Sequence, residues 1–136
     1  HHWHDVGQAL REVKRVLKPG GIFIIMDVMS PGHPVRNIWL QTVEALRDTS
    51  HVQNYASGEW LSLITEAGLI ARSLITDRLP LEFSSWIARM RTPEALSQAI
   101  RLYQESASAE VKAYFELQDD GSFTSDTIMA EAQKEG

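Results

Sequence analysis

The sequence predicts an α/β fold, in which helices and strands alternate along the chain. The segment Leu10–Asp27 reads as an amphipathic helix, a break and a short apolar strand, and a similar alternation continues to the end of the chain. The predicted order is one helix, one strand, two helices, one strand, three helices and one strand. Because a short strand that is apolar on both faces needs neighbours on both sides, we expect the chain to be the C-terminal portion of a larger domain.

The composition excludes several classes of function. The chain has 136 residues, a net charge of -5, a hydrophobic content of 43% and no cysteine. The lack of a lysine and arginine cluster argues against nucleic acid as a partner. Without cysteine there are no disulfides, thiolate metal sites or cysteine nucleophiles, which suits a cytoplasmic protein. No apolar run approaches the roughly 20 residues of a membrane span.

The first helix is expected to begin after Asp5, with Asp5 as its N-cap and Gln8 as the reciprocal partner. Its apolar positions recur at helical spacing and its last turn is basic, which suits the helix dipole. Pro19-Gly20-Gly21 should end this helix. The apolar run Ile22–Val28, interrupted only by Asp27, then predicts a central parallel strand.

The middle of the chain predicts two helices and a strand. A loop over residues 30–34 precedes an amphipathic helix whose apolar stripe runs from Val35 to Leu46. Ser57 is expected to cap a short helix that Gly68 closes. Leu69–Thr76 reads as the second strand, and Pro80 should end that region.

Residues 82–115 predict three consecutive helical pieces. Thr92-Pro93 marks a restart, and Ser108 is a candidate cap for the third piece. A turn at residues 119–121 leads to the last predicted strand, Thr127–Gln133. We expect most aromatic side chains on the helical stripes to pack in the core rather than to line a site. These are Trp39, Trp60, Phe83, Trp86 and Tyr103.

A motif in the first unit resembles class I S-adenosylmethionine-dependent methyltransferases. It consists of a helix, a Lys-Pro-Gly-Gly break and a strand that ends in an acid, and the resemblance is strongest to the UbiE-like group, which methylates ubiquinone and menaquinone precursors. His1-His2-Trp3 is similar to a segment that these enzymes carry after their fourth strand. The matching residues are Leu10, Glu12, Arg15, Leu17, Lys18, Pro19, Gly20, Gly21 and Asp27.

The resemblance implies a fold for the whole chain. Ile22–Val28 would be the fifth strand of a Rossmann-like methyltransferase domain, Leu69–Thr76 the sixth and Thr127–Gln133 the seventh. The family places the seventh strand antiparallel between the other two, so we expect a three-stranded mixed sheet of order 5-7-6 with flanking helices. Residues 1–136 would form the C-terminal part of one domain, with a helical insertion at about residues 82–116.

The resemblance also implies an activity, namely methyl transfer from S-adenosylmethionine to a small-molecule substrate. The family's glycine-rich loop and ribose-binding acid have no counterpart in this sequence. The Pro19-Gly20-Gly21 turn precedes a strand instead of opening a helix, so it is not expected to hold the cofactor. We therefore expect no binding of S-adenosylmethionine to this chain alone, and an alternative is a non-catalytic binding or oligomerisation module.

The candidate substrate-binding residues are His1, His2, Trp3, Asp27 and His33. The resemblance makes the first three a wall between the methyl group and its acceptor, whereas a bare reading of the histidines allows metal binding or a terminus without a role. Asp27 lies at the C-terminal end of a strand, where ligands of α/β sheets bind, but it could equally cap the following loop. No metal site and no certain catalytic residue are predicted.

The predicted edge of Ile22–Val28 suggests an assembly. If the fourth strand of the family is missing, this apolar strand exposes unpaired backbone groups without a proline or lysine to protect them. We therefore expect a homodimer or higher oligomer, formed through the Ile22–Val28 edge or by exchange of the first helix.

Overall fold

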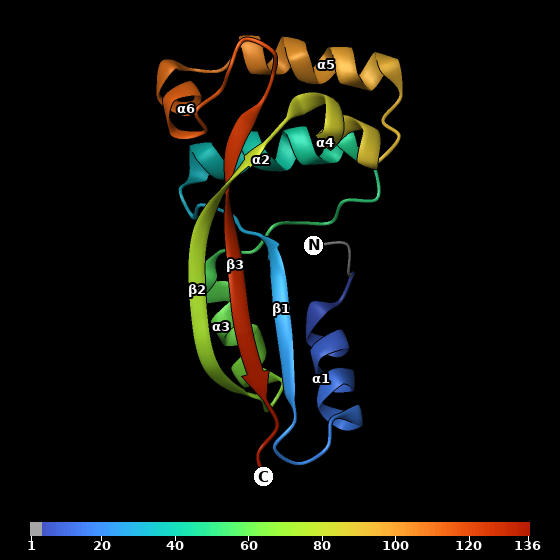
Figure 1. Cartoon of the computed structure of the whole chain (residues 1–136), viewed down its shortest axis with the longest axis vertical. Helices are drawn as coiled ribbons and strands as arrows, with labels where there is room; N and C mark the ends of the chain where they lie inside the picture. Colours follow the sequence, from blue (N-terminus) through green and yellow to red (C-terminus); the bar gives the residue numbers. More distant parts are fainter. Residues whose placement is uncertain (1–3) are drawn as a thin grey trace.

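In the computed structural model, which describes residues 4–136, a three-stranded sheet carries helices at one end (Figure 1). We call the helices of residues 82–116 the helical cap. The order of elements is the predicted one. The strands are β1 (Ile22–Val28), β2 (Ile70–Leu81) and β3 (Phe123–Gln133). The helices are α1 (Val6–Val16), α2 (Pro34–Arg47), α3 (Ser57–Glu66), α4 (Phe83–Arg89), α5 (Glu94–Glu105) and α6 (Ala109–Tyr114).

The sheet has the order β1-β3-β2, so the last strand of the chain inserts between the other two. This is the 5-7-6 order that the family resemblance implied. Both pairings are antiparallel, with Met129 opposite Met26 on one side and opposite Ile75 on the other. The expected mixed sheet is therefore wrong in one respect for the described residues: β1 and β2 run the same way, but β3 separates them, so no parallel pair forms.

Two strands are longer than the sequence predicts. β2 continues through Pro80, which was expected to end the region, and Pro80 lies opposite Thr124 of β3. A proline is tolerated there because β2 has a partner on one side only in the described sheet, so its missing N–H costs no ladder bond on the outer edge. The added length carries β2 and β3 up into the helical cap (Figure 1).

The helix ends largely follow the predicted capping chemistry. The Asp5 carboxylate accepts a bond from the Gln8 N–H at 2.9 Å, and Ser108 caps α6 in the same way. Ser57 is the first helical residue of α3, not its cap. The N-cap is Ala56, whose N–H donates to the Glu59 carboxylate at 3.0 Å. Gly68 has a φ of +83°, the left-handed conformation that closes a helix.

Two hydrophobic cores hold the molecule together. In the first, α1 and α3 pack on one face of the sheet, with Leu10 and Ile64 against the alternate β3 residues Ile128 and Ala130. In the second, Trp86, Ile100 and Phe115 of the helical cap pack with Trp39 of α2 and Phe123 of β3. The Trp39 and Phe115 rings lie 4.5 Å apart between centroids. The helices of residues 82–116 thus share the second core with α2 and the ends of β2 and β3, and their origin as an insertion stays a prediction.

Candidate functional site

The candidate site lies at the C-terminal end of β1, where the sheet meets the helical cap. The Asp27 carboxylate accepts a bond from the Val28 N–H at 2.8 Å, which fixes the side chain at the end of the strand. The next residues are held by other segments, since Met29 N–H donates to the Asp126 carbonyl and Ser30 N–H to the Tyr55 carbonyl. The loop after β1 is therefore tied both to β3 and to the segment before α3.

A chain of polar side chains follows this loop along α2. The Ser30 hydroxyl donates to Asn37 Oδ1 at 2.6 Å, and the Gln41 amide donates to the same oxygen at 3.2 Å. Gln41 Oε1 accepts from the Asn54 N–H at 3.2 Å and lies 2.8 Å from His51 Nε2. The amide of Gln41 therefore links the loop after β1 to the segment between α2 and α3.

This series of hydrogen-bonded side chains ends at the buried carboxylate of Glu44. The side chains of Glu44 and His51 are each only 3% exposed, with His51 Nδ1 3.9 Å from Glu44 Oε2. Arg47 Nη1 lies 3.5 Å from Glu44 Oε1, and the guanidinium lies over the Trp86 ring at 4.9 Å. Burial raises the pKa of Glu44, Arg47 opposes this rise, and the negative charge of Asp27 adds to it. Glu44 and Asp27 thus belong to one electrostatic environment.

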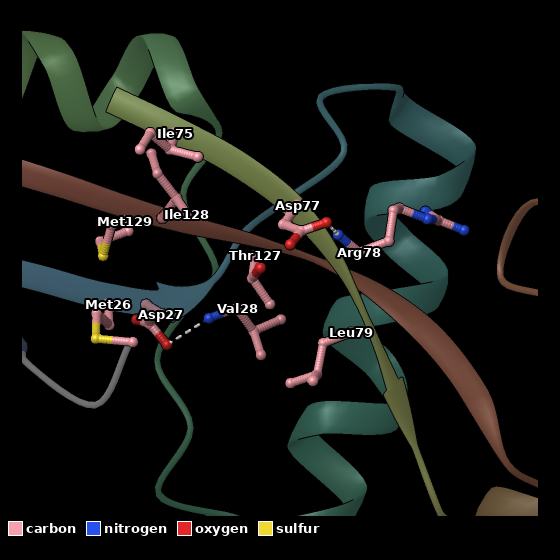
Figure 2. Close-up of a pocket in the computed structure, with 10 residues that line it drawn as sticks. All are labelled: Met26, Asp27, Val28, Ile75, Asp77, Arg78, Leu79, Thr127, Ile128 and Met129. Carbon is pink, nitrogen blue, oxygen red and sulfur yellow. Dashed lines mark hydrogen bonds between the residues drawn. The ribbon is translucent and has the colours of Figure 1, made fainter. Parts of the chain in front are cut away.

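Asp27 also lines a groove on the sheet. A groove of about 520 Å³ crosses the three strands on the face away from α1 and α3 (Figure 2). Figure 2 shows Met26 and Met129 with their sulfur atoms along this groove, and Asp77 and Arg78 where it approaches the helical cap. The walls are mainly apolar, and they also include Asp27, Val28, Ile75, Leu79, Thr127 and Ile128.

The predicted site residues lie in different places in the structure. His1, His2 and Trp3 lie outside the described residues, so their proposed role as a wall stays a prediction. Asp27 lies where the sequence placed it and contributes to the electrostatics of Glu44. His33 is exposed at the N-cap position of α2 and makes no side-chain capping bond there. Substrate binding by Asp27 or His33 stays a prediction.

Sequence reasoning missed the polar stripe of α2. Asn37, Gln41 and Glu44 follow a spacing of four and three residues, which places them on one face of a helix. The predicted apolar stripe was partly wrong, because Val35 and Ile38 are exposed whereas Glu44 is buried. A polar stripe at helical spacing was the signal that could have found these residues, but its burial depends on the segment 51–54 folding over α2.

The Pro19-Gly20-Gly21 turn is separated from the candidate site by the length of β1. The Pro19-Gly20-Gly21 turn lies at the N-terminal end of β1, opposite the end that carries Asp27. A Cβ on Gly21 would lie 2.8 Å from the Lys18 carbonyl oxygen, so this glycine serves a tight turn. Within residues 4–136 no group of three or more histidine, aspartate or glutamate side chains could hold a metal ion.

No helix among residues 4–136 is both long and apolar enough to cross a membrane.

The comparisons of the sequence point to methyltransferases. The model of the methyltransferase domain family matches residues 1–25. The uncharacterised protein YafE from Escherichia coli (strain K12) is 78% identical over 134 residues, which cover 98% of this chain and 65% of YafE. The uncharacterised methyltransferase YcgJ from Bacillus subtilis (strain 168) is 35% identical over 85% of this chain and 46% of its own length.

Two solved structures superpose on the whole of this chain. The crystal structure of YcgJ superposes with a TM-score of 0.88 at 33% identity, covering all of this chain and 60% of that one. A proposed methyltransferase from Bacillus halodurans C-125 superposes with a TM-score of 0.92 at 26% identity, covering all of this chain and 66% of that one. The chain therefore spans less than two thirds of the length of its curated relatives. In its first 25 residues and in its fold the chain is therefore similar to methyltransferases, the family that its sequence resembled.

Proposed function

We propose that the chain forms the acceptor side of a methyltransferase that acts on a small molecule with S-adenosylmethionine as the methyl donor. The observation that carries the proposal is the superposition of the whole chain on the two solved relatives. When bound, S-adenosylmethionine would supply an electrophilic methyl group to the acceptor, with its sulfur as the leaving group. In this proposal the cofactor is held mainly by polypeptide that the longer relatives carry, because the glycine-rich loop expected for the family has no counterpart in this sequence.

In this proposal the chain orients the acceptor. Asp27 stands at the end of β1, the place where ligands of α/β sheets bind. Behind it, the chain of bonds from Ser30 through Gln41 to His51 and Glu44 fixes the loop after β1. Holding reactants in position is itself a large source of rate enhancement, so methyl transfer to a nucleophilic acceptor requires no dedicated base. The acceptor is an unidentified small molecule, and the resemblance to the UbiE-like group and the cytoplasm as the location stay predictions.

The proposal is tested with a longer polypeptide, in which the part of YafE outside its aligned 65% is restored to this chain. S-Adenosylmethionine with a labelled methyl group is incubated with the restored protein and a pool of small molecules, and labelled products are separated. We expect cofactor binding by the restored protein and transfer of label to a small molecule. Replacement Gln41→Leu should reduce transfer while leaving cofactor affinity unchanged, and Gln98→Leu, on the exposed side of α5, is the matched control.

A restored, folded protein that binds no S-adenosylmethionine and transfers no label would contradict the proposal. It would favour the second candidate, a non-catalytic binding or oligomerisation module. The observation that keeps this candidate is β1, which has a strand partner on one side only within the described sheet. An unpaired strand edge can pair with another chain.

A further inference from the structure

The hydrogen bonds around His51 determine which of its ring nitrogens carries a hydrogen. Gln41 Nε2 donates to the Asn54 carbonyl at 3.1 Å, and Gln41 Oε1 accepts from the Asn54 N–H at 3.2 Å. A backbone N–H can only donate and a carbonyl can only accept, so the Gln41 amide has one orientation. His51 Nε2 lies 2.8 Å from Gln41 Oε1 and must therefore be the donor in this bond.

The other ring nitrogen of His51 faces a carboxyl group. Nδ1 lies 3.9 Å from Glu44 Oε2, and both side chains are only 3% exposed. In a neutral ring that carries its hydrogen on Nε2, Nδ1 presents a lone pair. A lone pair opposite an ionised carboxylate is repulsive, and burial keeps water from screening the repulsion. One proton, placed on Glu44 or on Nδ1, makes the contact attractive.

The charges near Glu44 leave room for this proton. Burial has the largest effect and raises the pKa of Glu44, whereas Arg47, 3.5 Å from Oε1, opposes the rise. The negative charges of Asp27 and Asp48 raise the pKa of Glu44 further. Burial lowers the pKa of Arg47, and the positive charge of Arg89 adds to that effect. Two carboxylates and one guanidinium thus act on Glu44, and its burial favours the protonated acid.

The segment that carries His51 also holds the end of β1. The Asn54 side-chain amide donates to the Val28 carbonyl at 3.4 Å. The Tyr55 carbonyl accepts from the Ser30 N–H at 2.9 Å. These two contacts come three and four positions after His51, so a displacement of His51 is passed on to the loop after β1.

We infer that Glu44 and His51 share one proton, and that this proton keeps the segment carrying His51 closed over α2. In the closed arrangement His51 is a positioning residue for the loop after β1, which begins directly behind Asp27. When the proton passes to water at higher pH, a lone pair is left against a carboxylate and the segment opens. The structure thus contains a pH-sensitive latch on this loop.

Magnetic resonance of the native 136-residue chain tests the shared proton. Labelled ring nitrogens report the protonation of each histidine, and labelled side-chain carboxyl carbons report that of Glu44. The signals that disappear in His51→Gln and Glu44→Gln identify the two residues. His33, which is exposed, is the internal control.

At pH 6 we expect a hydrogen on His51 Nε2 and one further proton divided between Nδ1 and Glu44. As the pH rises, the nitrogen and carboxyl labels should report the loss of this proton in one common step, because the two groups titrate as a pair. The signals of His33 should show no such coupling to a carboxyl group. A bare Nε2, or a neutral His51 beside an ionised Glu44 at pH 6, would overturn the inference.

Glu44→Gln tests the latch itself, because the new amide can donate a hydrogen to His51 Nδ1 at every pH, as the protonated acid does. Glu66→Gln, at the exposed end of α3, is the matched control. The measurement is the protection of the Asn54 N–H against hydrogen exchange, corrected for the intrinsic effect of pH.

From pH 6 to pH 8 this protection should fall at least about tenfold in the native chain and in Glu66→Gln, and by less than about twofold in Glu44→Gln. No fall in the native chain, or an equal fall in all three proteins, would overturn the latch. If Glu44→Gln folds poorly, the titration of the native chain still decides whether the proton is shared. Neither experiment uses S-adenosylmethionine, so the latch can fail independently of the proposed activity.

Discussion

Arg78 and Asp126 are register partners on neighbouring strands, and the guanidinium Nη1 lies 3.1 Å from the carboxylate Oδ1. The other carboxylate oxygen accepts a bond from the Tyr114 hydroxyl, and Arg78 also donates to the Tyr114 carbonyl. Both Arg78 and Arg36 lie over the ring of Tyr114, with guanidinium carbons 4.6 and 4.1 Å from its centroid. These contacts join the last turn of α6 to the strands at the point where the sheet enters the helical cap.

We predict that Asp126→Asn lowers the free energy of unfolding by about 1–3 kcal/mol, because it removes a charge-assisted acceptor that serves two partners. Tyr114→Phe, which removes one of the two bonds, should cost less. Since the two residues share a bond, the double variant should lose less than the two single losses added together. Urea denaturation of the three variants provides the measurement, and strict additivity would show that the two residues act independently.

The buried Glu44 should make stability depend on pH. Burial raises its pKa above the ordinary value of 4.5, so the proton binds more tightly in the folded state than in the unfolded state. The stabilisation from this group is therefore complete below pH 4.5 and is lost as the pH rises through the raised pKa. We expect Glu44→Gln to reduce the fall in unfolding free energy over that range.

The matched control for Glu44→Gln is Glu66→Gln at the exposed end of α3. Chemical denaturation at a series of pH values from 4 to 8 compares the two variants with the native chain. The control should follow the native profile. If Glu44→Gln also follows it, then Arg47 and His51 compensate fully for the burial of the carboxylate.

Glycine at position 121 should be required by its conformation and by its neighbours. Its φ is +93°, and an added Cβ would lie 2.8 Å from Phe83 Cδ1 and 2.9 Å from Gln104 Oε1. Gly121→Ala should destabilise the chain by more than about 1 kcal/mol. In contrast, Gly58→Ala lies in the first turn of α3 with no atom within 4 Å of its Cβ, and it should be neutral or stabilise by up to about 1 kcal/mol. Thermal unfolding of both variants tests this difference.

The 136-residue chain alone should not bind S-adenosylmethionine, because its described residues offer no glycine-rich helix start for the cofactor. Isothermal titration of the native chain should give no heat of binding at micromolar concentrations. Micromolar affinity would contradict this prediction and would mean that this chain binds the cofactor without a glycine-rich loop.

We also predict that the 136-residue chain self-associates through the outer edge of β1. Sedimentation at micromolar concentration should show at least twice the chain mass of 15.3 kDa. Edge pairing uses backbone groups, so Met26→Lys, which changes a side chain on the exposed face of the sheet beside Ile75 and Met129, should leave the oligomer intact. A monomer in the native chain would refute edge pairing, and an oligomer that Met26→Lys dissolves would assign the contact to that exposed face.

Local features of the sequence were enough to predict β1 and the order of the helices and strands. The bounds of β1 and the order of all nine elements were predicted correctly, because helical periodicity, the Asp5 cap and the Gly68 stop act over a few residues. The position of the last strand between the other two came from the family resemblance. Periodicity alone suggested a parallel neighbour for β1, since an apolar run does not specify the direction of its partner.

Tertiary structure decided the features that depend on distant segments. β2 runs past Pro80 only because β3 offers a partner along its whole length, and proline is tolerated at that edge. Glu44 is buried where the segment carrying His51 and Asn54 folds back over α2, which places these two residues against Gln41, ten and thirteen positions earlier in the chain. The apolar residues of β1 looked equally buried in the sequence, but the helices cover Ile25 and leave Met26 exposed, since the alternation of a strand separates neighbours onto opposite faces.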